Sequence, residues 1–505
     1  MSDRIDPSRC HSGRDPFAEA CRFLEAKSAG RRPSSLVSIA PAQDWLALAA
    51  ERLWPGITIV SLQPDPGFRG TEVPSSAIRW YPDSPRCIRD FLAGTLEGSM
   101  DGGILVAEWR PALARYPGFA TAAGTELAEA LRFLSSARNS ERYWARRWLL
   151  NSCRNFLRLD SVSVIRRDAR PVLLAGAGPG LESALDELSE LRGRLRVWTL
   201  ASAAEACVVR GFHPELLFAS DAGAWSLLHF RFPEALPVVA PIHAKLPAGM
   251  VERGNLVPAE LGIFHDAPLL AALGAEAVPL APHGTAAGSA ASLAAWSGAT
   301  AVVMAGVDFA ALDLRDHARP YAFDALDRSG ESRLKPSHSA VFSRVTTHYP
   351  SRTVGRWRVS RAFEAYSGAG LPCAAALTLS ASPASPFSIP RIDAAEARSL
   401  LAPAPESNAS IHGPFPTRLT RSERENLLPG LLGRLAESVA TALERLEPGA
   451  RLPDPIRQGL EAFCGAASSE WLAERARGAN TPSLTAATAA LAREAPRELL
   501  EELLG

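Results

Sequence analysis

The chain has 505 residues, a formal net charge of zero, 47% apolar side chains and 21% charged side chains. One hydrophobic core does not organise a chain of this length, so two or three domains are expected. The composition excludes a disordered chain, and the balanced charge excludes a global field that recruits nucleic acid or anionic lipid.

Cysteine usage and the N-terminal segment indicate the compartment. The seven cysteines are scattered and form neither a CxxC pair nor a metal-ligand spacing. The first residues, MSDRIDPSRCHSGRDPF, lack the apolar core of a secretion signal, and no apolar run is long enough to span a bilayer. The sequence therefore predicts a cytoplasmic protein with free thiols and no membrane insertion.

The N-terminal part alternates strand and helix patterns. Residues 1–34 predict a polar leader with one short helix, and residues 35–120 a small α/β domain. A helical connector follows over 121–168 and carries Arg138, Arg142, Arg146 and Arg147. These arginines form either a phosphate-attracting patch or the solvated face of a packed helix, and the solvated face is the simpler interpretation.

Residues 169–380 repeat a strand–turn–helix pattern. Strands are predicted over 171–175, 195–200, 216–219, 237–241 and 301–305, and helices over 181–191, 203–210 and 285–297. This alternation predicts a central Rossmann-like, mostly parallel sheet with ligands at the carboxyl ends of its strands. Residues 381–420 predict a proline- and serine-rich linker, and residues 421–505 a helical C-terminal region.

The stretch AGAGPG follows the first of these strands and opens a helix. Gly176, Gly178 and Gly180, together with Pro179, allow a tight turn that directs backbone N–H groups toward an anion such as phosphate. The third glycine is out of register for a dinucleotide fingerprint, and the second strand ends in Ser202 instead of an acid. NAD and FAD are therefore disfavoured, and a ligand-free turn remains the alternative.

Other polar residues are predicted at the same edge of the sheet. Asp221 and Asp308 each follow an apolar strand, and their carboxylates suit a ribose, a sugar or a cation. His317 follows in a polar loop as a candidate general base. For Asp221 a turn cap, and for His317 simple solvation, are the structural alternatives.

A helix of small residues begins after the sequence PHGT. His283, Gly284, Thr285 and Ser289 lie at or just before its start, where glycine permits close approach of a ligand or of another backbone. Close helix–sheet packing explains these small residues equally well. His283 is the second candidate base.

The segments LLAGAGPGLESALDEL, GFHPELLFASDAG, HGTAAGSAASLAAWSGATAVVMAGVDFA and DHA together resemble a known family. They are similar to the central domain of the bacterial motility-associated factor (Maf) flagellin glycosyltransferases, which is related to the 6-hydroxymethylpterin diphosphokinases (the MptE-like domain). The resemblance covers residues 170–325 and extends, through RYWARRWLLNSCRNF, toward residue 35. The family usually has Ser where this chain has Gly180, Pro-Asp where it has Pro-Glu, and Gln where it has Val307.

The resemblance implies a sialyltransferase-like domain that moves a nonulosonic acid from a CMP-activated donor onto Ser or Thr of flagellin. It matches the glycine turn, Asp221, Gly284, Ser289, Asp308 and His317 to family positions. In this hypothesis the turn and Ser202 hold the nucleotide, and the two acids orient sugar or ribose. His317 or His283 takes the acceptor proton, and no metal or other cofactor is obligatory.

Two other hypotheses remain open. A diphosphokinase of the pterin type would use ATP and Mg²⁺ held by Asp221 and Asp308. A non-catalytic member would instead serve as a binding or assembly module of the motility apparatus, and glycine at position 180 in place of Ser is its main support.

Overall fold

The computed structural model describes residues 10–100, 103–231, 236–348, 351–360, 371, 375–384, 386–401, 411–447, 450, 452–476 and 482–504. The chain divides into two compact units, Met1–Arg146 with Leu432–Gly505, and Arg147–Leu431. Within the described ranges, no helix has both the length and the apolar composition that crossing a membrane requires. Cys373 lies outside those ranges, and the other six cysteines are free.

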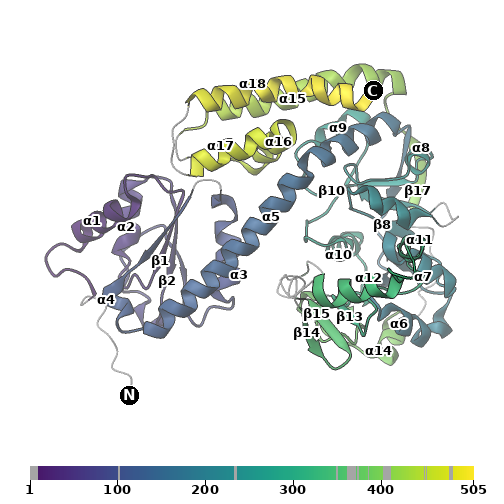
Figure 1. The fold of residues 1–505 in the computed structure, drawn as a ribbon, viewed down its shortest axis with the longest axis horizontal. Coiled ribbons are helices and arrows are strands. Elements are labelled where there is room, and N and C mark those ends of the chain that lie inside the picture. Colours follow the sequence, from purple (N-terminus) through teal and green to yellow (C-terminus); the bar gives the residue numbers. More distant parts are fainter. Residues whose placement is uncertain are drawn as a thin grey trace. The chain divides into compact units, whose positions relative to one another are not determined.

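The first unit contains a four-stranded parallel sheet in the order β3-β2-β1-β4. Its strands are β1 (Ser35–Ile39), β2 (Thr58–Leu62), β3 (Ile78–Trp80) and β4 (Ile104–Glu108), and its helices are α1 (Pro16–Ser28), α2 (Trp45–Leu53), α3 (Ile88–Leu96) and α4 (Arg110–Leu113). Helices α1 and α2 lie on one side of β1 and β2, and α3 lies on the other (Figure 1). The central strand β1 is buried at every position because both faces of the sheet are covered. These strands and helices alternate as the sequence predicted for residues 35–120, within a unit that extends to Arg146 and includes Leu432–Gly505.

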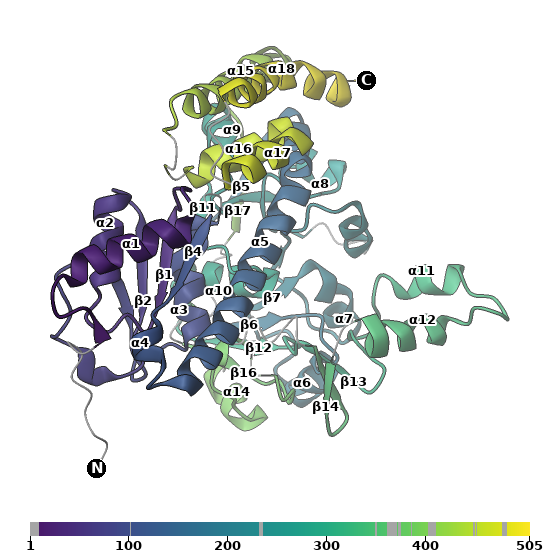
Figure 2. The same ribbon diagram turned by 60° about the vertical axis from the view of Figure 1, so that its left-hand side comes forward.

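The C-terminal helices belong to this same unit. They are the end of α15 (Arg421–Glu444), α16 (Asp454–Cys464), α17 (Ala466–Ala476) and α18 (Pro482–Leu504). Helices α15 and α18 run side by side in both views (Figures 1 and 2), and Arg493 of α18 joins them through ion pairs with Glu437 and Glu444.

The basic residues of the long helix α5 (Pro117–Arg158) pair with these C-terminal helices. Arg138 lies 3.4 Å from Asp454, and Arg146 lies 3.0 Å from Glu502. Arg142 donates to Ser469. Arg142 and Arg146 remain exposed beside these partners, as expected for a solvated face, whereas Arg138 is mostly buried. Their acidic and polar partners do not support a phosphate patch.

The second unit is built on an eight-stranded, entirely parallel sheet in the order β11-β10-β9-β8-β7-β6-β12-β16. Its strands are β6 (Val172–Ala175), β7 (Val197–Leu200), β8 (Leu216–Phe218), β9 (Val238–Pro241), β10 (Leu256–Glu260), β11 (Val278–Pro279), β12 (Val302–Ala305) and β16 (Ala376–Thr378). Its covering helices include α6 (Leu181–Glu187), α7 (Ala204–Val209), α8 (Ala248–Glu252), α9 (Asp266–Leu273) and α10 (Ala286–Ser297). The prediction of a mostly parallel α/β sheet is confirmed, and the ends of the five predicted strands are shifted by one or two residues. Strands β10, β11 and β16 were not predicted.

Several elements of the second unit were not predicted. The expected linker 381–420 contains helix α14 (Ala394–Leu400) and strand β17 (Ile411–Pro416), which pairs antiparallel with β5 (Ser161–Ile165). A small antiparallel sheet is formed by β13 (Ala310–Leu312), β14 (Ser351–Val354) and β15 (Trp357–Ser360). Helices α11 (Asp324–Ser329) and α12 (Ser337–Ser343) project from the sheet as a hairpin (Figure 2).

The last turns of α5 lie against the loops that follow β8 and β9. The Asn155 side-chain amide donates to the carbonyls of Ile242 and Ala244, at 2.7 and 2.9 Å. Asn151 donates in the same way to the carbonyls of Ala222 and His243, both at 3.1 Å. These buried amides satisfy carbonyl groups beyond the strand ends and fix the loops to the helix.

Replacement of Asn155 by Ala is expected to lower the free energy of unfolding by about 2 kcal/mol, because two buried carbonyls lose their donor. The matched control is Asn139→Ala on the same helix, where the side chain is exposed and little change is expected. Urea denaturation of both variants measures the difference. Equal stability of the two variants would contradict the anchoring role of Asn155.

Candidate functional site

The sheet of the second unit changes direction between β6 and β12. The chain proceeds from β6 outward to β11 and then crosses to the other side of β6 to form β12. In open parallel sheets, the crevice beyond the carboxyl ends of two such strands is the usual place for a ligand. The glycine turn and the segment Gly306–Asp308 meet at this position.

All three glycines of the turn bind the end of β12 or the segment after it through their backbone N–H groups. Gly176 donates to the carbonyl of Ala305 at 2.8 Å, and Gly178 donates to the carbonyl of Gly306 at 2.7 Å. Gly180 donates to a carboxylate oxygen of Asp308 at 2.7 Å. The expectation that these N–H groups face a ligand is wrong, because the protein itself accepts all three hydrogen bonds.

The close approach explains why the turn is rich in glycine. A Cβ atom at position 176 would lie 2.7 Å from the carbonyl oxygen of Gly306, and one at position 180 would lie 2.8 Å from the Asp308 carboxylate. A Cβ at position 178 would also meet that carboxylate. The serine that the resembled family has at position 180 does not fit beside Asp308 in this arrangement.

Asp308 is a buried residue that joins three segments. Its side chain is buried, accepts from the Gly180 N–H, and accepts from the hydroxyl of Ser380, just beyond β16. Burial raises the pKa of the Asp308 carboxyl, and the two hydrogen bonds oppose that rise. Both carboxylate oxygens are therefore engaged, and the expected role of Asp308 in orienting a sugar is not supported by its placement.

His317 lies in a loop fixed to the glycine turn. The N–H of Ala318 donates to the carbonyl of Ala177 at 2.8 Å, and the N–H of Arg319 donates to Glu182 at 2.7 Å. These bonds hold the loop over the start of α6. The His317 side chain is one-third exposed, so it is accessible from solvent at the predicted edge.

An acidic neighbour and an aromatic ring orient the His317 imidazole. Its Nδ1 lies 3.2 Å from Asp316, and its ring stacks on Tyr321 with centroids 3.9 Å apart. Burial alone would raise the pKa of Asp316, but His317 and Arg344 lower it, so Asp316 is a carboxylate. The contact is an ion pair without hydrogen-bond geometry, since Nδ1 has no hydrogen-bond partner among the described residues. Nε2 remains to accept a proton, as a general base requires.

A second imidazole, which the sequence analysis did not select, belongs to the same cluster. His229 lies in the last turn of the 3₁₀ helix η6 (Ala224–Phe230), and its ring lies 5.7 Å from that of Tyr321 and 5.4 Å from that of Phe323. Burial and then His317 lower the pKa of His229, while Asp221 opposes the shift. His229 is therefore neutral at pH 7, but a lone histidine between LL and F gave no signal in the sequence.

The remaining predicted residues of the central strands lie at the carboxyl edge as expected. Asp221 is exposed beyond β8, and its carboxylate accepts from the Gly223 N–H at 2.8 Å, so the predicted turn cap is present. Ser202 is half-buried in the 3₁₀ helix Ala201–Ala203 after β7. The parallel strands place both residues on the same edge as the glycine turn.

The four residues around the start of α10 serve local packing. Thr285 caps the helix by accepting from the Gly288 N–H at 3.1 Å, and a Cβ at position 288 would lie 2.5 Å from that of His283. Ser289 is buried, and Gly284 has a positive φ of 68°. Burial lowers the pKa of His283. Among the described residues, no hydrogen bond or ion pair links this group to His317 or Asp221, so the structure does not bring the two candidate bases together.

A buried polar network lies behind the edge. Asp266 accepts from the Ser152 hydroxyl at 2.8 Å, lies 2.5 Å from Nδ1 of His243, and lies 3.4 Å from His265. Burial alone would raise the pKa of Asp266, but His243 and His265 lower it. All four side chains are buried, so the network joins α5, the β9 loop and α9 and does not face a substrate.

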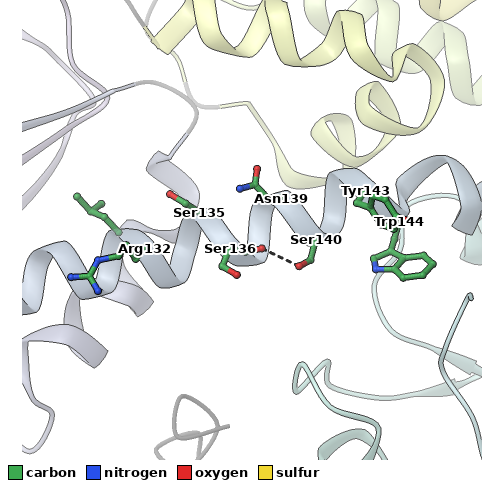
Figure 3. A pocket seen from close by; sticks show the side chains of 8 residues that line it. Arg132, Ser135, Ser136, Asn139, Ser140, Tyr143 and Trp144 are labelled. Atoms are coloured by element: carbon green, nitrogen blue, oxygen red, sulfur yellow. Dashed lines mark hydrogen bonds between the residues drawn. The ribbon is translucent and has the colours of Figure 1, made fainter. Parts of the chain in front are cut away.

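A surface hollow of about 560 Å³ lies along α5 in the first unit (Figure 3). It is lined by side chains of that helix alone, among them Arg132, Ser136, Asn139 and Tyr143. No predicted site residue contributes to it. Over the described ranges, no group of three or more His, Cys, Asp or Glu side chains is placed to hold a metal ion.

Comparisons with known proteins give few matches. No family model matches the chain. An uncharacterized protein of Treponema pallidum (strain Nichols) is 26% identical over 270 residues, which are 53% of this chain and 59% of that protein. The match therefore spans less than two thirds of the relative's length.

The chain is similar to a solved structure. That structure is of the MAf glycosyltransferase from Magnetospirillum magneticum AMB-1, with a TM-score of 0.48 and 10% identity, over 99% of this chain and 85% of that one. That protein carries the name of the family that the sequence motifs resemble. A likeness of this size carries no argument about activity, which therefore rests on the geometry of the site.

Gly180→Ala is expected to lower the free energy of unfolding by about 2 kcal/mol, because its Cβ would displace the Asp308 carboxylate. Gly433→Ala is the control, since a Cβ there meets nothing within 4 Å and alanine favours the helix. Thermal and urea denaturation compare the two variants. A stable Gly180→Ala protein would show that the contact with Asp308 is not required.

His265 is expected to make the protein sensitive to mild acid. Burial lowers the pKa of its imidazole to about 4 from 6.5, so the unfolded chain binds an extra proton between these values. The free energy of unfolding has its full value above pH 6.5 and falls by about 3 kcal/mol as the pH drops to 4. His265→Phe should flatten this dependence, whereas His338→Phe, at an exposed position, should not.

Proposed function

We propose that this protein is a glycosyltransferase that moves a sugar from a nucleotide-activated donor onto a hydroxyl group of a protein acceptor. The observation that supports this proposal best is His317, oriented by Asp316 and Tyr321 on a loop bound to the glycine turn. The proposed substrates are those that the resemblance of the sequence motifs to the Maf family implies. The donor is a CMP-activated nonulosonic acid, and the acceptor is a Ser or Thr of flagellin or of a related surface protein.

His317 acts as the general base of the transfer. The acceptor oxygen forms a bond to the anomeric carbon while the bond from that carbon to the phosphate oxygen breaks. The acceptor proton moves to Nε2 of His317, and the electron pair of the broken bond leaves with CMP. Asp316, on the opposite nitrogen, stabilises the imidazolium that forms.

His229, Asp221 and the aromatic rings bind and position the substrate. His229 is neutral because burial lowers its pKa, so it is able both to accept and to donate a hydrogen bond. The exposed carboxylate of Asp221 accepts hydrogen bonds from sugar hydroxyls. Tyr321 and Phe323, whose rings stack with centroids 5.4 Å apart, supply the apolar wall beside these groups.

The geometry favours this proposal over a diphosphokinase. That activity would need Asp221 and Asp308 together as magnesium ligands. Both oxygens of Asp308 already accept hydrogen bonds, from Gly180 and Ser380, and the side chain is buried. Asp221 alone remains accessible to a cation.

His317→Gln is expected to lower kcat for CMP release, measured with CMP-pseudaminic acid and flagellin, by about 100-fold, because the base is lost. His338→Gln, at an exposed position on α12, is the matched control and should retain full activity. Asp316→Asn should give a smaller loss, together with a shifted pH profile.

Three outcomes count against the proposal. The first is the absence of CMP release with every nonulosonate donor. The second is full activity of His317→Gln, which would remove the base from the mechanism. The third is magnesium-dependent conversion of ATP to AMP, which would favour the diphosphokinase.

A further inference from the structure

The N–H groups of the three turn glycines already donate to Ala305, Gly306 and Asp308. A negatively charged ligand would therefore need other donors. Three basic side chains lie at another position on the same edge of the sheet. Lys245 follows β9, and Arg154 and Arg158 lie on the last turns of α5. All three side chains are half-buried.

Hydrogen bonds hold the backbone that carries these three residues. Asn155, next to Arg154, donates to the carbonyl of Ala244, next to Lys245, at 2.9 Å. The Lys245 N–H donates to the carbonyl of Asp221 at 2.9 Å, and the Lys245 carbonyl accepts from the Ser226 hydroxyl at 3.2 Å. The loop after β9 is therefore joined both to the helix and to the loop after β8.

The three cations repel one another. Burial lowers the pKa of the Lys245 ammonium group, and the charges of Arg154 and Arg158 lower it further. Within the described ranges, no carboxylate pairs with any of the three side chains. Other arginines of this unit do have acidic partners, as Arg170 has Asp168 and Arg344 has Asp316.

Three adjacent, partly desolvated cations without an acidic partner suit a phosphate group, because each side chain supplies a charged donor to its oxygens. The position also fits a nucleotide that reaches the catalytic cluster. The tips of β9 and β6 are three strand spacings apart, about 14 Å, with Asp221 and His229 following β8 between them. In a CMP-activated sugar the phosphate oxygen is bonded to the anomeric carbon, so a phosphate held by these cations would bring the reacting carbon to the loop of Asp221, which Lys245 contacts through its backbone.

We propose that Lys245, Arg154 and Arg158 bind the phosphate group of a nucleotide at the carboxyl edge of the sheet. This inference rests on the proposed function only for the nucleoside and the sugar that the phosphate group carries. The cation cluster takes the role that the sequence predicted for the glycine turn.

Calorimetric titration of the full-length protein with CMP, cytidine and inorganic pyrophosphate tests the inference. We expect Lys245→Met and Arg154→Met each to weaken CMP and pyrophosphate binding at least tenfold, and to leave cytidine binding unchanged. Lys335→Met, which removes an exposed lysine from the hairpin loop, is the control and should bind all three as the unaltered protein does. Arg158→Lys keeps the charge and should lose less affinity than Arg158→Met.

The results separate this inference from the proposed function. CMP binding that survives Lys245→Met, or an unaltered protein that binds neither CMP nor pyrophosphate, overturns the phosphate site. Binding to phosphatidylglycerol vesicles without binding to CMP places the phosphate on a lipid and also overturns it. CMP binding that depends on Lys245, with no sugar transfer, keeps the phosphate site and overturns the transferase.

Discussion

The carboxylate of Asp308 organises the functional edge of the second unit. It accepts from the N–H of Gly180 and from the hydroxyl of Ser380, so it joins the turn after β6, the segment after β12 and the segment after β16. An anion from the protein thus occupies the N–H group that a phosphate would otherwise take. The same contact requires glycine at positions 178 and 180. His317, on the loop fixed to this turn, is accessible from solvent, as is Asp221 beyond β8.

The polar side chains of this edge therefore lie around the filled turn. His317 has an acid on one nitrogen and is accessible to solvent, which suits proton transfer. His229 and Asp221 follow β8, and the cations around Lys245 follow β9, so successive strand tips carry different chemistry. A ligand that lies along this edge would meet different side chains at successive strands. Parallel strands bring their carboxyl ends to one edge, which makes such a distribution available to this fold.

Periodicity in the sequence predicted the alternating strands and helices of the second unit well, because strands such as VLLA and VVMA are buried on both faces. It did not predict β17, whose pairing with β5 joins residues some 250 positions apart and lies in a segment rich in proline. The turn AGAGPG was expected to direct its N–H groups toward an anion, and that of Gly180 does bind one, but the anion belongs to the protein. Its partner was not predictable, because an N–H group that faces a phosphate and one that faces Asp308 have the same local sequence. His229 was missed for a related reason, since only tertiary contacts bring it to Tyr321.

The position of Ser380 along the chain has a consequence for how the protein is made. This residue follows Asp308 by 72 positions, and its strand β16 is the last to join the large sheet. Until Ser380 has been synthesised, the Asp308 carboxylate can accept only from Gly180. Strand β12 has no neighbour on its outer side until β16 pairs with it. The edge that carries the candidate site thus acquires its final form only after β13, β14 and β15 have been synthesised, and the nascent chain exposes the edge of β12 until then.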